Sequence, residues 1–326
     1  MRSLLRKLTR LGKVNVDSSP DRATAEDIRA CFRLILGRKP NPEEWPGHSL
    51  RTGQDLKSVV SSYLQSSEFH ARGMLSSTEF RQYALTEING TKVALYPDDL
   101  DVGSTLVHGV YEPHVTALLK AQIKPGMRVV DVGANCGYFT FLARKLVGEQ
   151  GDVFAVEPHM SNVRLLVIGC RENEYDNVHI VPVAAGAQTG IATLRAAHTN
   201  GVTSDLSNLD DIMEVTLVPQ FPLDSIASDI DFIKLDIEGR ELDALRGFIA
   251  GLSRRPLIVS EFFPGMLRLQ NVTGEEYLRF IFSHRYRIGV IGSAGEVLAY
   301  HREPHPILQA YQESQVDHID IFAVPD

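Results

Sequence analysis

The sequence has 326 residues, a formal net charge of −8 at pH 7 and a hydrophobic content of 44%, which is ordinary for a soluble globular protein. This length allows a large core and more than one domain, while the acidic balance argues against a general nucleic-acid binder and no apolar run is long enough to span a bilayer. Because its three cysteines, Cys31, Cys136 and Cys170, are widely spaced, we expect neither a disulfide framework nor a zinc site, and a cytoplasmic location.

Residues 1–16 are basic and contain leucines at helical spacing (Leu4, Leu8 and Leu11). A solvated chain end is the simpler interpretation, and peripheral contact with the anionic inner face of a membrane is the alternative. We divide the chain into a basic segment at 1–20, a helical accessory domain at 21–82 and a larger α/β domain at 83–326.

The accessory domain is predicted from two helical patterns, over 25–36 and 56–64, separated by a break at 37–42. Ser66-Ser67-Glu68-Phe69 has the pattern of a cap followed by another helix. Through Leu36-Gly37-Arg38, Pro40 and Ser67-Glu68-Phe69, the segment resembles a small helical domain of unassigned function that is often attached to bacterial glycosyltransferases and other exopolysaccharide proteins. The resemblance implies a connection with glycans; the pattern itself predicts only a helical docking module.

The larger domain opens with a predicted β-hairpin over 83–96, turning at Asn89-Gly90, which we expect to cover the site. Tyr111-Glu112-Pro113 then begins a predicted helix that ends near residue 121. Glu112 is either an acid favoured by the positive end of the helix dipole or a ligand contact.

Residues 129–140 predict a strand, a tight turn and a helix, because an apolar run stops at Asp131 and is followed by Gly133 and Gly137. Glu157-Pro158 ends the next apolar run, where a carboxylate can accept the hydrogen bonds of a ribose diol. The loop lacks the Gly-x-Gly pair that brings backbone to a pyrophosphate, which disfavours a nicotinamide dehydrogenase. A carboxylate at 131 instead suits a cationic or amine-bearing ligand such as S-adenosylmethionine.

Three motifs occur in the order typical of one enzyme family: residues 131–140 (Asp-Val-Gly-Ala-Asn-Cys-Gly-Tyr-Phe-Thr), Val156-Glu157-Pro158, and residues 234–239 (Lys-Leu-Asp-Ile-Glu-Gly). On these motifs the chain resembles the FkbM-type S-adenosylmethionine-dependent methyltransferases. The resemblance implies a Rossmann-like class I methyltransferase sheet, mostly parallel with an antiparallel last strand, and a Tyr-Glu pair near the cofactor. The predicted cofactor-binding residues are Tyr111, Glu112, Asp131, Gly133, Ala134, Asn135, Gly137, Phe139, Thr140, Glu157, Pro158 and Ala184.

The βαβ rhythm continues with predicted helices over 138–147 and 161–172 and a strand over 178–183. The run Ala184-Ala185-Gly186 either lets an adenine ring lie against backbone or is a simple tight turn. Short strands are predicted over 191–196 and 215–218, with residues 199–204 between them as a substrate loop.

In residues 230–239, a buried strand is predicted to end in Lys234, Asp236 and Glu238, which share one side if the extended geometry persists. These charges either converge on a ligand cleft or form a self-satisfied ion cluster that positions the helix predicted over 241–248. Glu261 ends the next strand and is expected near Asp236, so these two carboxylates could share a proton or a divalent metal. A helix over 275–283 and strands over 286–291 and 318–324 complete the sheet.

The sequence therefore favours an O-methyltransferase that acts on a sugar hydroxyl in bacterial polysaccharide or glycan biosynthesis. Holding the acceptor oxygen in line with the methyl group supplies most of the rate of methyl transfer. Because a sugar hydroxyl is a weak acid, a base that removes its proton or a metal that stabilises the alkoxide is also expected. The expected catalytic residues are Asp236 as base or metal ligand, Glu261 as second candidate, Lys234 as alkoxide stabiliser or positioning residue, and Glu238 as substrate ligand. The alternatives are methylation of a small natural product such as a polyketide, and a non-catalytic glycan-biosynthesis scaffold.

Overall fold

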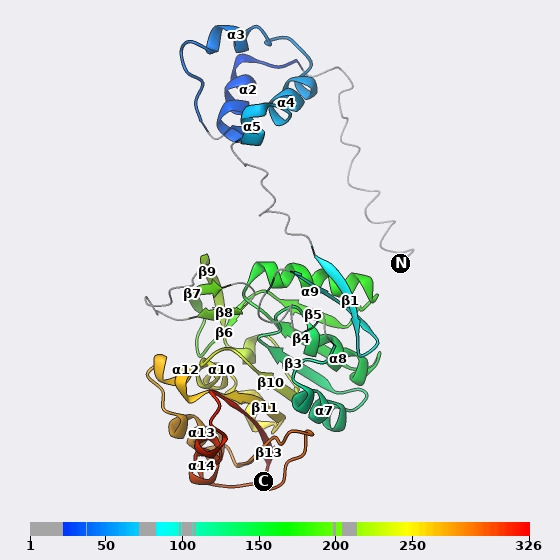
Figure 1. The fold of residues 1–326 in the computed structure, drawn as a ribbon, viewed down its shortest axis with the longest axis vertical. Coiled ribbons are helices and arrows are strands. Elements are labelled where there is room, and N and C mark those ends of the chain that lie inside the picture. Colours follow the sequence, from blue (N-terminus) through cyan, green and yellow to red (C-terminus); the bar gives the residue numbers. More distant parts are fainter. Residues whose placement is uncertain are drawn as a thin grey trace. The chain divides into compact units, whose positions relative to one another are not determined.

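The structure is a computed structural model that describes residues 22–36, 38–71, 83–97, 99, 106, 109–197, 200–203 and 214–326. The basic segment predicted at 1–20 lies outside the described residues. The chain divides into two compact units, Met1–Arg81 and Gln82–Asp326 (Figure 1). Within the described part, no helix is both long and apolar enough to cross a bilayer.

The first unit is helical, as expected for this segment. Its elements are α2 (Ala25–Ala30), a π-helical turn (Cys31–Ile35), α3 (Trp45–Ser49), α4 (Leu56–Leu64) and α5 (Ser67–Ala71). The single helix predicted over 25–36 is therefore wrong in detail, because the α-helical pattern changes to a π-helical one at Cys31. Ile28, Phe32, Val59 and Tyr63 form the buried core.

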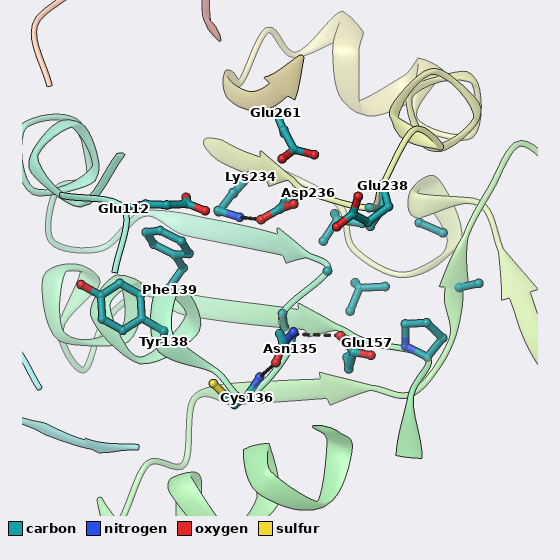
Figure 2. Close-up of a pocket in the computed structure, with 18 of the residues that line it drawn as sticks. Glu112, Asn135, Cys136, Tyr138, Phe139, Glu157, Lys234, Asp236, Glu238 and Glu261 are labelled. Atoms are coloured by element: carbon teal, nitrogen blue, oxygen red, sulfur yellow. Dashed lines mark hydrogen bonds and ion pairs between the residues drawn. The ribbon is translucent and has the colours of Figure 1, made fainter. Parts of the chain in front are cut away.

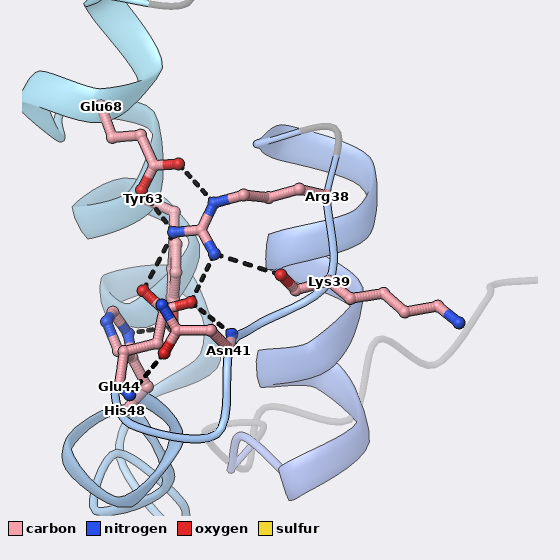
Figure 3. A network of polar contacts seen from close by, with 7 residues as sticks. All are labelled: Arg38, Lys39, Asn41, Glu44, His48, Tyr63 and Glu68. Atoms are coloured by element: carbon pink, nitrogen blue, oxygen red, sulfur yellow. Dashed lines mark hydrogen bonds and ion pairs between the residues drawn. The ribbon is translucent and has the colours of Figure 1, made fainter.

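A polar network joins three parts of this unit (Figure 3). The Arg38 guanidinium donates to both the Glu44 and the Glu68 carboxylates, with Nη2···Oε2 distances of 3.0 Å and 2.7 Å. His48 Nδ1 lies 2.6 Å from the Tyr63 hydroxyl. Arg38 and Glu68 belong to the motif that suggested the glycan-associated domain, and this network gives both residues a structural role that requires no ligand.

The second unit is built on a seven-stranded sheet in the order β12-β13-β11-β10-β3-β4-β5. Strand β13 runs antiparallel to both of its neighbours, and the other pairings are parallel. The strands are β3 (Arg128–Val132), β4 (Asp152–Val156), β5 (Val178–Val181), β10 (Phe232–Leu235), β11 (Leu257–Phe262), β12 (Tyr286–Val290) and β13 (Ile319–Pro325). The predicted fold class, a Rossmann-like class I methyltransferase sheet with an antiparallel last strand, is confirmed.

Successive side chains on each central strand point to opposite faces and enter two separate apolar cores. Val129 and Phe232 belong to one core, whereas their neighbours Val130 and Ile233 belong to the other. This explains why these strands read as continuous apolar runs: a parallel sheet is covered on both faces.

The first core is covered by α7 (Pro113–Gln122), α8 (Tyr138–Val147), α9 (Met160–Glu172) and the hairpin of β1 (Ala84–Ile88) and β2 (Thr91–Leu95). The second is covered by α10 (Glu241–Arg246), α11 (Ile249–Ser253), α12 (Pro264–Leu269), α13 (Gly274–Ser283) and α14 (Pro304–Ser314). The hairpin turn at Asn89-Gly90 is confirmed, and β2 contacts α8 and α9. The helix predicted over 241–248 is present as α10 but ends at Arg246, and a separate helix, α11, begins at Ile249.

A smaller sheet has the order β6-β9-β7-β8, with β6 (Ala184–Ala185), β7 (Gly190–Ala197), β8 (Asn200–Thr203) and β9 (Glu214–Phe221). The strand predicted over 178–183 is present as β5 but ends two residues earlier, at Val181, and the chain then joins this second sheet as β6. Pro182 has no N–H to continue the ladder, and Val183 N instead bonds Val181 O at 2.9 Å. The loop predicted over 199–204 is wrong in its described part, because residues 200–203 form the strand β8; Thr199 and Ser204 lie outside the described residues.

Candidate functional site

A cavity of about 280 Å³ opens at the carboxyl ends of β3, β4, β10 and β11. The chain runs from β3 outward through β4 and β5, but β10 and β11 extend the sheet on the other side of β3. The cavity therefore lies at a topological switch point, where open α/β sheets bind ligands. Among the residues predicted for the site, those that line the cavity are Tyr111, Glu112, Gly133, Ala134, Asn135, Phe139, Glu157, Pro158, Ala184, Lys234, Asp236, Glu238 and Glu261.

The loop after β3 forms one wall of the cavity and lies against the end of β10. Gly133 has φ +84°, and a Cβ at this position would stand 1.8 Å from the carbonyl oxygen of Asp236. Only glycine fits this approach. Asn135, two residues on, has φ 48° although it carries a side chain. The loop is thus shaped by contact with β10 as much as by any requirement of a ligand.

Glu157 is buried and holds this loop in place (Figure 2). Its carboxylate accepts hydrogen bonds from Asn135 N and from His159 N, each at 2.8 Å. Burial raises the pKa of Glu157 to about 7, and the backbone donors at His159 and Asn135 oppose that rise. The side chain lines the cavity, where the sequence predicts a ribose ligand, while also anchoring the loop after β3.

Asp131 lies off the cavity, together with Gly137 and Thr140, although the sequence places all three among the cofactor residues. Its Oδ2 accepts a 2.6 Å hydrogen bond from the Thr140 hydroxyl, and its buried Oδ1 has no hydrogen-bond partner among the described residues. Burial raises the pKa of Asp131, and Lys234 opposes the rise. The sequence-based picture of Asp131 in direct contact with the ligand is not what the geometry gives; its influence on the cavity is electrostatic.

Lys234, on β10, and Asp236, the first residue after this strand, come together as their two-residue spacing predicts. Lys234 Nζ donates to Asp236 Oδ2 at 2.6 Å and lies 4.5 Å from the centroid of the Phe139 ring (Figure 2). Burial by itself would lower the pKa of Lys234, but the carboxylates of Asp236, Glu112 and Asp131 raise it above its ordinary value. Lys234 is therefore a permanent buried cation that balances three carboxylates.

Glu112 reaches the same cation from the start of α7 (Figure 2). Its backbone is left-handed, with φ 39° and ψ 71°, and its side chain does not cap the helix. Burial raises the pKa of Glu112 to about 7, while Lys234 opposes the rise. A strained backbone at a cavity-lining acid is more typical of a ligand-binding position than of a simple helix-start acid.

Glu238 and Glu261 complete the acidic wall. Glu238 does not continue the extended strand as predicted, because β10 ends at Leu235 and Glu238 has φ 54°. Glu261 lies on the neighbouring strand β11, as expected. Burial, followed by the charges of Asp236 and Glu238, raises the pKa of Glu261 to about 11, so this group carries a proton at neutral pH. In the described ranges, no three His, Cys, Asp or Glu side chains are grouped to hold a metal ion.

Sequence reasoning missed the contribution of the segment before β13. Asp317, His318 and Phe263 also line the cavity. His318 Nδ1 lies 2.9 Å from Asp317 Oδ1, and its Nε2 lies 3.7 Å from Glu261 Oε1. The antiparallel last strand was the available signal, since it must begin at the edge of the sheet where the parallel strands end.

Comparison with known proteins finds a family match within the second unit. Residues 131–288 match the profile of a family described as "Methyltransferase FkbM domain". A protein-L-isoaspartate O-methyltransferase of Methanothrix thermoacetophila is 31% identical over 78 residues, which are 23% of this chain. The matched segment spans only 37% of the length of that relative.

Similar solved structures are also methyltransferases. A SAM-dependent O-methyltransferase from Thermotoga maritima shares 14% identity, with 74% of this chain and 77% of that chain covered and a TM-score of 0.40. A SAM-dependent methyltransferase from Aquifex aeolicus shares 17% identity over 66% of this chain and 92% of that chain, with a TM-score of 0.36. Residues 131–288 are thus similar to the methyltransferase FkbM domain, and the sheet order of the second unit is the one that this resemblance implies.

Proposed function

We propose that this protein transfers a methyl group from S-adenosylmethionine to a sugar hydroxyl in bacterial polysaccharide or glycan biosynthesis. One observation carries the proposal: a single cavity joins the loop wall of β3 and β4 to the polar side chains at the ends of β10 and β11. A cofactor at the first wall would present its methyl group to an acceptor at the second.

The cavity residues fit this cofactor. Glu157 offers a carboxylate at the end of β4, and Val183 and Ala184 offer an apolar edge for an adenine ring. Glu112 and Asp236 supply the negative charge that favours a sulfonium cation. When bound, the cofactor supplies an electrophilic methyl group; the protein's contribution is to hold the acceptor oxygen in line with it.

The acceptor side is suited to a neutral hydroxylated compound. The Asp236 carboxylate, oriented by Lys234, can accept a hydrogen bond from an acceptor hydroxyl, and protonated Glu261 can donate one. Glu238 lines the same wall and is assigned to a further hydroxyl. Sugars present several hydroxyls at once, which matches this alternation of acceptors and donors.

The glycan assignment also draws on the accessory domain's resemblance to domains of exopolysaccharide proteins. We propose a cytoplasmic enzyme without nucleic acid as a partner; contact of the basic residues 1–16 with the inner membrane face is the alternative to a solvated chain end. A small natural product such as a polyketide would use the same chemistry. The acids at 131 and 157, which are buried, and at 236 and 238, which line the cavity, argue against a non-catalytic scaffold, because charges in such places are costly to keep.

Calorimetric titration tests the cofactor assignment. S-adenosylmethionine should bind the purified chain and NAD should not, and Glu157→Ala should weaken the binding by at least about tenfold, because both a ligand contact and the loop anchor are lost. Glu149→Ala, at an exposed glutamate, is the matched control. Binding of NAD would overturn the family assignment, and absence of binding to either compound would favour the scaffold.

The acceptor class needs a separate assay. Transfer of labelled methyl from S-adenosylmethionine to a panel of methyl glycosides should be detectable, and Asp236→Asn should reduce it. Normal turnover by Asp236→Asn would remove that residue from the reaction. Transfer to polyketide alcohols but to no glycoside would replace the sugar acceptor by the alternative.

A further inference from the structure

We propose that His318 is the general base that removes the proton from the acceptor hydroxyl, with Asp317 as the residue that positions its imidazole. The inference rests on the proposed methyl transfer to a hydroxyl and assigns a residue that the motifs of the family do not include. It is carried by the position of the ring at the cavity wall and by the contacts of its two nitrogens.

The two ring nitrogens of His318 have different surroundings. Nδ1 lies 2.9 Å from the Asp317 carboxylate, which can only accept a hydrogen bond when ionised, so Nδ1 carries the proton. Nε2 lies 3.7 Å from Glu261 Oε1, which is beyond hydrogen-bond distance. In this tautomer the lone pair of Nε2 is uncommitted to Glu261 and available to an acceptor hydroxyl in the cavity.

The neighbouring acids are less suited to the role. Asp236 is held by the ammonium of Lys234 at 2.6 Å, so a proton taken up by Asp236 would break a buried ion pair. Glu261 already carries a proton at neutral pH, because burial and the Asp236 charge oppose its ionisation. A neutral imidazole needs no such disruption, and histidine is the side chain best suited to take up a proton near neutral pH.

The architecture places His318 on the acceptor side. Strand β13 begins immediately after it and is antiparallel to β11, with Phe262 opposite Ile319 and Glu261 opposite Asp320. The ring centroid lies 5.9 Å from that of Phe263. In the proposed step, the oxygen–methyl bond forms as the methyl–sulfur bond breaks, the hydroxyl proton passes to Nε2, and the imidazolium later releases this proton to water.

Kinetics on the full chain provide one test, with the methyl glycoside that accepts most label. His318→Gln should lower kcat by about 10²- to 10⁴-fold, the usual contribution of a general base, while its affinity for S-adenosylmethionine stays within about twofold. His305→Gln, at an exposed histidine of α14, is the matched control and should match the unaltered protein. Unchanged turnover in His318→Gln would overturn the proposal.

A second test needs no acceptor and therefore separates this inference from the proposed function. In a long-range ¹H–¹⁵N spectrum of histidine-labelled protein at pH 8, with His318 identified by its loss in His318→Gln, Nδ1 should carry the proton. Asp317→Asn should move the tautomer equilibrium toward Nε2–H and lower kcat more than it raises KM. A proton on Nε2 in the unaltered protein would exclude His318 as the base, even if a glycoside is methylated.

Discussion

The ammonium of Lys234 and the carboxylate of Asp236 form a 2.6 Å ion pair in which the lysine side chain is only 5% exposed. The charge of Lys234 also acts on two further acids, Glu112 and Asp131, whose pKa values it lowers against the effect of burial. The ammonium of Lys234 therefore balances the charges of three carboxylates, those of Asp236, Glu112 and Asp131.

Lys234→Met should lower the free energy of unfolding by about 3–5 kcal/mol, because breaking a buried pair leaves carboxylates without a counter-charge. Urea unfolding monitored by far-ultraviolet circular dichroism measures this change; the single tryptophan, Trp45, reports on the other unit. Lys120→Met, at an exposed lysine of α7, is the control. Equal losses in the two variants would show that the pair contributes no more than a surface contact.

Gly133→Ala should disrupt the contact between the loop and β10, because its Cβ would meet the Asp236 carbonyl at 1.8 Å. Gly126→Ala is a matched control: Gly126 has φ +83°, almost the same as Gly133, but open space around its Cβ position. The control should lose about 1–3 kcal/mol from backbone strain alone. Thermal unfolding should show a clearly larger loss for Gly133→Ala, and similar melting temperatures would contradict the close approach.

Thr140→Val should leave Asp131 without its hydroxyl donor and cost about 1–3 kcal/mol, the usual penalty for a buried polar group left unpaired. A double-mutant cycle with Asp131→Asn, followed by urea denaturation, isolates the interaction between the two side chains. Strictly additive effects would mean that the hydroxyl and the carboxylate do not interact.

Glu241 gives a pH-dependent prediction away from the cavity. Burial raises its pKa from 4.5 to about 7, although its carboxylate accepts hydrogen bonds from Ile237 N and Gly239 N. Between these values the folded state binds more protons than the unfolded state, so stability falls as the pH rises.

Glu241→Gln should therefore gain stability relative to the unaltered protein by about 3 kcal/mol between pH 4.5 and pH 8, at 1.36 kcal/mol for each pKa unit. Unfolding free energies measured at both pH values check this. The exposed control Glu149→Gln should show no such change. A constant difference between Glu241→Gln and the unaltered protein would mean that Glu241 ionises normally.

The sequence is most informative where local chemistry determines structure. Asn89-Gly90 predicts the hairpin turn, the apolar runs predict the central strands, and the Lys234–Asp236 spacing predicts their meeting. Prediction from the sequence fails where a contact between residues far apart in the chain determines the local structure. Glu238 leaves the strand geometry, and Pro182 diverts the chain into a second sheet.

The site shows the same division. Asp131 follows the pattern of a ligand-binding acid, but its partner is Thr140, one helical turn into α8, and no local pattern reveals that the pair lies beneath the cavity. His318 is separated from Glu261 by three helices and a strand, so only the order of the assembled sheet brings them together. Local spacing identifies residues on one strand, whereas the meeting of residues from β11 and β13 depends on topology.

The insertion of β13 between β11 and β12 has a consequence for synthesis of the protein. Both neighbours precede β13 in the chain, so on the ribosome they emerge with a gap between them that no earlier segment fills. The strands of the cofactor wall, β3 and β4, are translated long before β13. The segment that carries His318 is therefore the last part of the cavity lining to leave the ribosome.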